Sequence, residues 1–204
     1  AGNLNEDLAR LNGDPLLLAK TNEVLQRTSG LTMSGKLSIH HLLHVIVDEI
    51  GLDKVSEKVR NPIDFPIAGF YGPNMQQEGA CGEDDVFDPQ YLELLIKALG
   101  GEPVMWESRT QSVGVPGLFS EEATVLRQIA STINDAKSEG AAMIVSACTL
   151  SHTALDIYQG KASRATGLLT NIPVIHLTEM LAFAFGHYNN RLAQLRTRIA
   201  VIGD

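Results

Sequence analysis

The order of short apolar runs and helical stretches after residue 64 constrains the fold more than any other feature. Four short apolar runs read as strands, at 67–71, 103–106, 142–146 and 173–175. Stretches with helical spacing stand between or after them, at 89–99, 120–137, 151–158 and 177–185. Strands that alternate with helices form right-handed βαβ units, and such units build a parallel sheet. We therefore predict an α/β fold with a parallel sheet of about four strands flanked by helices.

The residues before this alternating region are mainly helical in pattern. Apolar residues at helical spacing over 4–27 are interrupted at Asp14 and Pro15, which predicts two helices. Asp14 would cap the second helix, and Pro15 would occupy its first turn. A further helix is expected at 37–50, ended by Gly51.

Charge and cysteine content exclude several classes of function. The formal net charge of −8 argues against nucleic-acid binding, because neutralising phosphates needs a basic surface. Cys81 and Cys148 form neither a disulfide framework nor a CxxC pair, which favours a reducing compartment. No apolar run is long enough to cross a bilayer. The sequence thus predicts a cytoplasmic protein without membrane insertion, and leaves a membrane-bound partner open.

Ligand sites in an open parallel sheet form at the carboxyl ends of the strands, and three of these ends carry unusual loops. The loops are Tyr71-Gly72-Pro73-Asn74, Ser112-Val113-Gly114 and Cys148-Thr149-Leu150-Ser151-His152. The third loop leads into a helix, whose N-terminal amides and dipole would favour a thiolate at Cys148. A buried, inert cysteine fits such a turn as well, so both interpretations stay open.

The strings that occupy these positions resemble a known module. They are "FYG" at 70–72, a glycine-containing loop about forty residues later, "CTLSH" at 148–152 and "IPVIHLTEMLAFAFG" at 172–186. This succession resembles the second cysteine-rich (CCG) module in the B subunit of heterodisulfide reductase, a module that also occurs in the E subunit of succinate dehydrogenase. The resemblance implies that residues 64–204 form a complete second module with a C-terminal tail. It also implies that residues 1–63 are the helical C-terminal part of a truncated first module.

In that family a single cysteine, an adjacent pair and a CxxC motif hold an iron–sulfur cluster or, in some members, zinc. Carried onto this chain, the five cysteine positions fall on Pro73, Ser112, Val113, Cys148 and Ser151. The family's neighbouring residues are present: Tyr71-Gly72 before the first position, Gly114 after the pair and His152 after the last. Proline and valine cannot ligate through their side chains, and one thiolate cannot hold a cluster. We therefore expect no metal and no cofactor in this chain.

Three functions remain open. The first is a subunit of a redox, electron-transfer complex whose degenerate cluster pocket serves a structural or partner-binding role, with other protein subunits or a second copy as partners. The second is a thiol-dependent oxidoreductase or small-ligand enzyme that uses Cys148, Ser151 and His152. Its pocket would be lined by Asn74, Gln76, Gln77, Thr110 and Gln111. The third is electron transfer itself, with cluster ligands from outside the chain. The helix at 177–185 and the tail at 192–202 are candidate partner surfaces.

The remaining polar clusters have simpler interpretations. His40 and His44, four residues apart on the helix expected at 37–50, could chelate zinc, as could Cys81 with Cys148 and His152. Buried or hydrogen-bonded histidines are favoured in both cases, and a capping role is favoured for His176. His41 precedes Gly51 by ten residues, as His176 precedes Gly186, which suggests two related modules. The acidic run at 83–85 is predicted to be a solvated turn.

Overall fold

The computed structural model describes residues 2–76 and 82–187, without the side chains of residues 2, 3 and 74. The expectations for Gln77, Cys81 and the partner-binding tail at 192–202 therefore lie outside the described residues.

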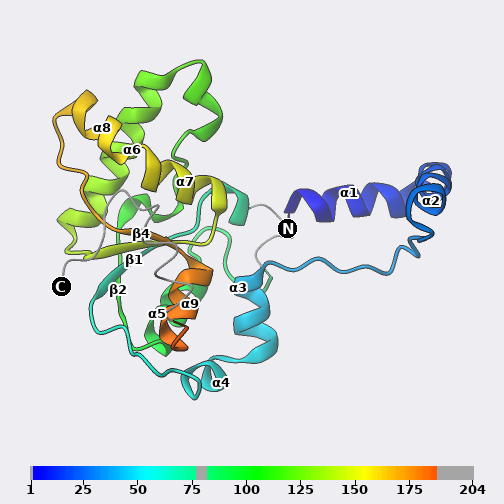
Figure 1. The fold of residues 1–204 in the computed structure, drawn as a ribbon, viewed down its shortest axis with the longest axis horizontal. Coiled ribbons are helices and arrows are strands. Elements are labelled where there is room, and N and C mark those ends of the chain that lie inside the picture. The colour runs from blue at the N-terminus through cyan, green and yellow to red at the C-terminus, as the bar shows by residue number, and fades with distance from the viewer. Residues whose placement is uncertain (1, 77–81, 188–204) are drawn as a thin grey trace.

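Within the described residues, a parallel sheet of four strands forms the centre of the fold (Figure 1). Its strands are β1 (Pro66–Phe70), β2 (Glu102–Val104), β3 (Met143–Ser146) and β4 (Val174–His176). Ala68 of β1 pairs with Val104 on one side and with Ile144 on the other. The predicted α/β class is confirmed.

The strands lie in the order β2-β1-β3-β4. The chain thus passes from β1 to a neighbour on one side, and then crosses back to place β3 on the other side. This reversal is a topological switch point, where an open α/β sheet leaves a crevice outside its carboxyl ends. The carboxyl ends of β1 and β3 meet at this crevice.

Side chains of the strands alternate between two apolar clusters, one on each face of the sheet. Ile67 of β1 belongs to the first cluster and Ala68 to the second, and both are fully buried. The first face is covered by α5 (Tyr91–Ala98) and α9 (Leu177–Ala184), and the second by α6 (Glu122–Ser138), α7 (Thr149–Ile157) and α8 (Gln159–Thr166). The apolar residues of α9 are core residues, so this helix does not present the partner surface considered above.

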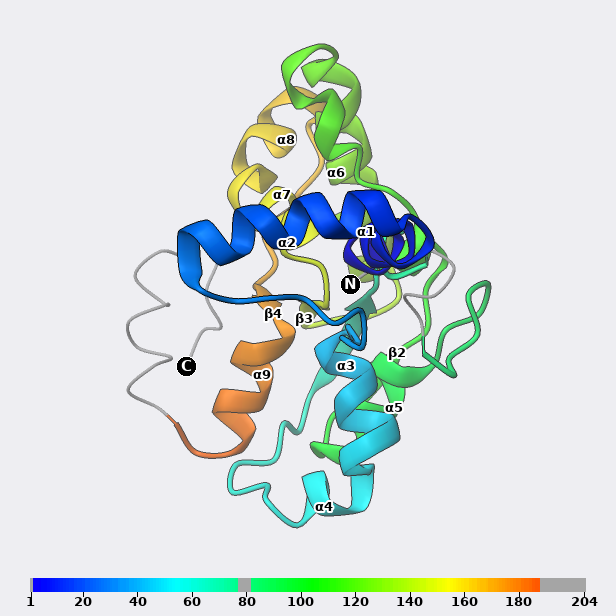
Figure 2. The ribbon, with the colours of Figure 1, turned by 90° about the vertical axis from the view of Figure 1, so that its right-hand side faces the viewer.

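The N-terminal helices are α1 (Gly2–Gly13) and α2 (Pro15–Ser29), as predicted. The Asp14 carboxylate accepts hydrogen bonds from the amides of Leu16 and Leu17, at 3.0 and 3.1 Å, and Pro15 opens the helix. α2 contains no buried residue. The two helices project from the body in Figure 1, and α2 passes in front of the sheet in Figure 2.

The helix predicted at 37–50 is shorter than expected. It begins at Leu42, with α3 (Leu42–His44) and a π-helical stretch, η1 (Val45–Ile50), and ends at Gly51, whose φ is 88°. The residues before it, 36–41, have no regular secondary structure, and the Asn5 side chain donates to the Ile39 carbonyl at 2.9 Å. His40 therefore precedes the helix, and the four-residue helical relation to His44 is wrong.

Residues of this helix and of the segment after it complete the first face of the sheet. Leu43, Ile46, Val55 of α4 (Leu52–Ser56) and Ile63 all belong to its apolar cluster. The division of the chain into two modules near residue 63 stays a prediction.

The sequence patterns did not predict several short elements. They are α4, the 3₁₀ turns η2 (Pro73–Met75), η3 (Glu107–Thr110) and η4 (Val115–Phe119), and α8. Of these, η2 follows the end of β1 and η3 the end of β2. α8 carries polar residues and Gly160, so its sequence has little helical signal.

Candidate functional site

Two of the loops picked out in the sequence approach each other closely at the switch point. Gly72, after β1, has a φ of 73°, which favours glycine. A Cβ atom at Gly72 would lie 2.7 Å from the Ser151 hydroxyl oxygen and 3.1 Å from Cβ of Cys148. The first and third loops thus meet at the positions that the family resemblance picks out.

Cys148 sits between the end of β3 and the start of α7. It is the N-cap residue of α7, and the hydroxyl of Ser146 accepts from its amide at 3.2 Å and donates to its carbonyl at 3.0 Å. Cys148 exposes only 7% of its surface, and Ser151, one turn into the helix, exposes 2%. The thiol is therefore placed at a helix N-terminus, as predicted, but offers little surface to a reagent.

His152 lies beside a second histidine. Its ring lies edge-on to the ring of His176, with 5.9 Å between the centroids. His176 is the last residue of β4, so this pair joins the carboxyl ends of two neighbouring strands.

In the second loop, Gly114 occupies the glycine position of the family motif, and the side chain of Val113 points into the core. Val113 exposes 1% of its surface and belongs to the apolar cluster of the second face. The Ser112 hydroxyl accepts from the amide of Gly114 at 3.1 Å, and Gly114 has a φ of 71°. The loop reaches the end of β1 through Arg109, whose carbonyl accepts from the amide of Tyr71 at 2.9 Å.

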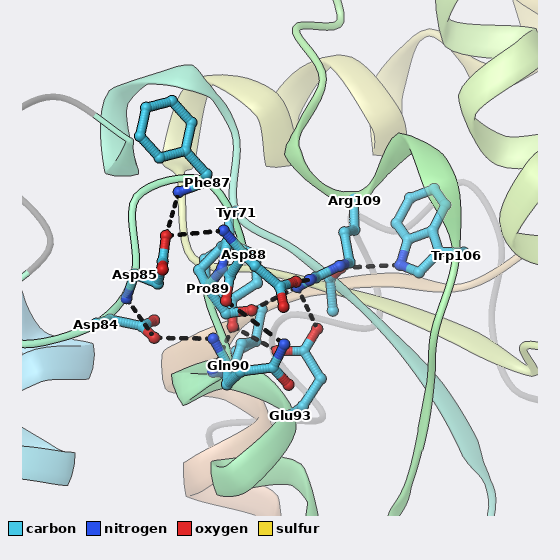
Figure 3. Close-up of polar contacts among 12 residues, drawn as sticks. Tyr71, Asp84, Asp85, Phe87, Asp88, Pro89, Gln90, Glu93, Trp106 and Arg109 are labelled. Atoms are coloured by element: carbon cyan, nitrogen blue, oxygen red, sulfur yellow. Dashed lines mark hydrogen bonds and ion pairs between the residues drawn. The ribbon is translucent and has the colours of Figure 1, made fainter.

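A buried polar network that the sequence patterns did not predict surrounds Tyr71 (Figure 3). The Tyr71 hydroxyl donates to the Glu93 carboxylate and accepts from the amide of Leu92 at 2.8 Å. The guanidinium carbon of Arg109 lies 5.9 Å from the centre of the Tyr71 ring. Burial raises the pKa of Tyr71, and the neighbouring Glu93 charge adds to this. Burial also raises the pKa of Glu93, against the hydrogen bond from Tyr71 and the positive charge of Arg109.

Arg109 connects this network to the loop that precedes α5. Its guanidinium donates to the Pro89 carbonyl, forms an ion pair with Asp88 and lies 3.4 Å from the Glu93 carboxylate. The network therefore ties together the loops after β1 and β2. The Tyr71-Gly72 motif gave a signal for one of its members, whereas Glu93 and Arg109 look like ordinary polar residues in the sequence.

The acidic run at 83–85 is more than a solvated turn. The Asp84 carboxylate accepts from the amides of Gln90 and Tyr91, at 2.8 and 3.1 Å, where α5 begins. Its partial burial raises the pKa of Asp84. The predicted turn thus caps the following helix from six residues upstream.

His41 is a structural residue with a defined tautomer. Its Nε2 faces the Ala147 carbonyl at 3.1 Å, and its Nδ1 accepts from the amide of Leu43 at 3.2 Å. These partners assign the proton to Nε2. Burial lowers the pKa of His41 to about 4, with a further contribution from His44, so the ring is neutral near pH 7. It joins the start of α3 to the end of β3.

His176 caps α9 in the same manner, as predicted. Its amide donates to the Glu179 carboxylate at 2.7 Å, and its Nδ1 faces the amide of Thr178. The helices that follow His41 and His176 both end at a glycine of positive φ, 88° at Gly51 and 85° at Gly186. The repeated spacing in the sequence thus reflects a shared local structure.

The pKa of His41 predicts that the protein loses stability in mild acid. Its ordinary pKa is 6.5 and its folded value about 4, so the unfolded chain binds more protons between these values. The free energy of unfolding should therefore fall as the pH drops from about 6.5 toward 4, by about 1–2 kcal/mol for this half-buried ring. Urea titrations at about pH 7 and about pH 4.5 would measure it.

His41→Asn is the matched control, because asparagine still caps a helix but does not titrate. The variant should lose less stability than the wild type between the two pH values. His44, whose pKa burial also lowers, titrates in both proteins, so the difference between them reports His41 together with its coupling to His44. An unchanged difference between the pH values would contradict the assignment.

A pocket of about 260 Å³ lies beside the cap of α3. It is lined by Asn5, Ser38, Ile39, His40, His41, His44 and Gly82. These are not the residues predicted for a ligand pocket, such as Thr110 and Gln111. Among the described residues no group of three or more histidine, cysteine or acidic side chains is arranged to hold a metal ion.

No protein-family model matches the chain, but several curated proteins do. It is 29% identical over 171 residues to the 8-methylmenaquinol:fumarate reductase membrane anchor subunit of Wolinella succinogenes, covering 83% of this chain and 57% of that protein. It is 25% identical over 190 residues to the B subunit of the ferredoxin/F420H2-dependent CoB-CoM heterodisulfide reductase of Methanosarcina acetivorans, covering 91% and 62%. A protein of Archaeoglobus profundus that is named as like the heterodisulfide reductase B subunit is 26% identical over 200 residues, with 94% and 66% covered. The chain therefore spans less than two thirds of these relatives.

A solved structure shares the fold. The crystal structure of a hypothetical protein from Helicobacter pylori superposes with a TM-score of 0.72 over 98% of this chain and 36% of the other, at 18% identity. At that identity the likeness concerns the fold alone.

The comparison with Wolinella succinogenes overturns the predicted cytoplasmic location, because that relative is named as a membrane anchor subunit. Within residues 2–76 and 82–187, no helix combines the length and the apolar character that crossing a membrane requires.

The sequence and structural findings agree on the family. The Tyr-Gly and Gly positions of the CCG motif lie in the segments after β1 and β2, and the His position lies in the first turn of α7 after β3. Relatives that match 91% and 94% of this chain carry the corresponding names. The chain is therefore a homologue of the B subunit of heterodisulfide reductase.

Proposed function

We propose that the chain is a subunit of a redox complex, similar to the heterodisulfide reductase B subunit. In this proposal the site formed by Gly72, Cys148 and Ser151 at the carboxyl ends of the strands holds no iron–sulfur cluster. It serves a structural or partner-binding role. The names of the relatives support the first part, because they are subunits of a heterodisulfide reductase and of a fumarate reductase.

The contact between Gly72 and the third loop is the observation that carries the second part. The Gly72 backbone packs against the side chains of Cys148 and Ser151, and this close contact leaves little space between the two loops. Of the other motif positions, Pro73 has no donor and Val113 is buried in the core. One thiol among these side chains does not fit an iron–sulfur cluster, or the four ligands of a structural zinc ion.

Iron binding tests the loss of the cluster. Full-length protein, purified without oxygen, would be incubated with ferrous iron and sulfide and then desalted. We expect visible absorption and an iron content equal to those of a Cys148→Ser variant, because a single thiolate at this site retains no cluster. A relative with all five motif cysteines would serve as positive control. Iron above the level of Cys148→Ser, with a visible band, would contradict the proposal.

Purification of the tagged full-length protein from its own host tests the role as a subunit. Co-elution with redox subunits in a complex of defined mass is the expected result. Light scattering on the separated protein would show whether it forms the predicted homo-oligomer. Elution of the native protein alone, without any redox subunit, would contradict the proposed role.

A further inference from the structure

The loop Gly82–Gln90 places a phenylalanine in water. Phe87 exposes 92% of its surface, although a phenylalanine side chain is among those that gain most from burial. Single exposed apolar residues are common on proteins, so exposure alone has no functional meaning. The hydrogen bonds and the ion pair that hold this loop distinguish Phe87 from an ordinary exposed residue.

Side-chain hydrogen bonds fix the backbone at Phe87. The Asp85 carboxylate accepts from the amide of Phe87 at 2.7 Å and from that of Asp88 at 3.1 Å. One residue earlier, Asp84 holds the start of α5. A loop whose backbone is already fixed loses little backbone entropy when it binds, which favours its use at an interface.

The loop is also tied to the interior of the molecule. Asp88 and Pro89 both bind the guanidinium of Arg109, which exposes only 6% of its surface. Figure 3 shows that the Phe87 ring lies away from this network, on the outer side of the loop. The phenylalanine is therefore displayed from a rigid base.

Acidic side chains surround the exposed ring. Glu83, Asp85 and Asp88 are exposed residues within four positions of Phe87, and 82–90 contains no lysine or arginine. A surface that receives this loop would need an apolar pocket for the ring, and basic residues around it for the carboxylates.

We propose that Phe87 inserts into an apolar pocket with a basic rim on another protein subunit, with Glu83 and Asp85 facing that rim. The proposal rests on the proposed function, since the partner is another subunit of the redox complex. Phe119 is 99% exposed at the end of η4, and the exposed Glu121 and Glu122 follow it, so it is a control for exposure and acidic surroundings together.

Site-specific cross-linking in the native complex tests the proposal. The photoreactive residue p-benzoylphenylalanine would replace Phe87, or Phe119, in the tagged full-length protein in its host. We expect position 87 alone to cross-link to another subunit, at a peptide that contains apolar residues and lysine or arginine. Phe87→Ala should lower the amount of that subunit recovered by about tenfold or more, whereas Phe119→Ala should leave it unchanged.

Charge reversal provides a second arm. Glu83→Lys should weaken recovery of the same subunit, and a lysine or arginine to glutamate change at the cross-linked peptide should restore it. Because Phe87 and Glu83 are exposed, thermal melting of the variants should match the wild type.

The outcomes separate this proposal from the proposed function. If the complex is recovered but position 87 cross-links only to a second copy, only to lipid or to nothing, the docking surface is wrong and the subunit role stands. If the wild-type protein is recovered without redox subunits, the subunit role itself is wrong, and the docking proposal falls with it.

Discussion

Replacing Arg109 by methionine should lower the free energy of unfolding by about 3–5 kcal/mol. Arg109 and Glu93 expose only 6% and 3% of their surfaces, so the change leaves a buried carboxylate without its positive partner. It also removes the donor to the Pro89 carbonyl and the cation beside the Tyr71 ring. Urea unfolding followed by circular dichroism would measure the loss.

Two further variants assign the loss to the unpaired charge. Arg109→Lys keeps the positive charge but loses the planar guanidinium with its several donors. It should lower the free energy of unfolding by less than Arg109→Met does. Adding Glu93→Leu to Arg109→Met should recover most of the stability, because an apolar pair replaces the isolated carboxylate. A loss below about 1 kcal/mol for Arg109→Met alone would show that the network contributes little.

Gly72→Ala is expected to destabilise by about 2–4 kcal/mol. Part of this is backbone strain, because the φ of 73° disfavours any side chain. The rest is steric, because the new Cβ would lie 2.7 Å from the Ser151 hydroxyl and 3.1 Å from Cβ of Cys148. Thermal and urea unfolding would provide the measurement.

Gly167→Ala is the matched control for the strain. Gly167 has a φ of 76°, and a Cβ there would meet no atom within 4 Å, so its replacement should destabilise by only about 1 kcal/mol. Gly72→Ala in a Ser151→Ala background should fall between the two, since the nearest oxygen is gone. Equal losses for Gly72→Ala and Gly167→Ala would mean that the two loops leave room between them.

The sequence predicted the strands and most helices because local patterns specify them. Short apolar runs mark the strands, and Asp14 with Pro15 marks a helix start through contacts within one turn. The strand order could not be read in this way, because it depends on packing between distant segments. The start of α3 was misplaced for the same reason: His41 bonds to Ala147, 106 residues away.

The candidate site was predictable only in part. Glycine after β1 and cysteine after β3 could be placed together, because carboxyl ends of parallel strands share one edge. Glu93 could not be found, since a glutamate in a helix is usually exposed and its partner Arg109 lies 16 residues later. The predicted cytoplasmic location was wrong because cysteine content and hydropathy describe this chain alone. They carry no information about the proteins or membranes to which it binds.

The lack of buried residues in α2 has an evolutionary consequence. Changes along its exposed sides do not reach the residues that hold the sheet together, so few of them are purged for loss of folding. Natural variation can therefore accumulate in α2 faster than in the sheet, and relatives that share the sheet can diverge in α2 first.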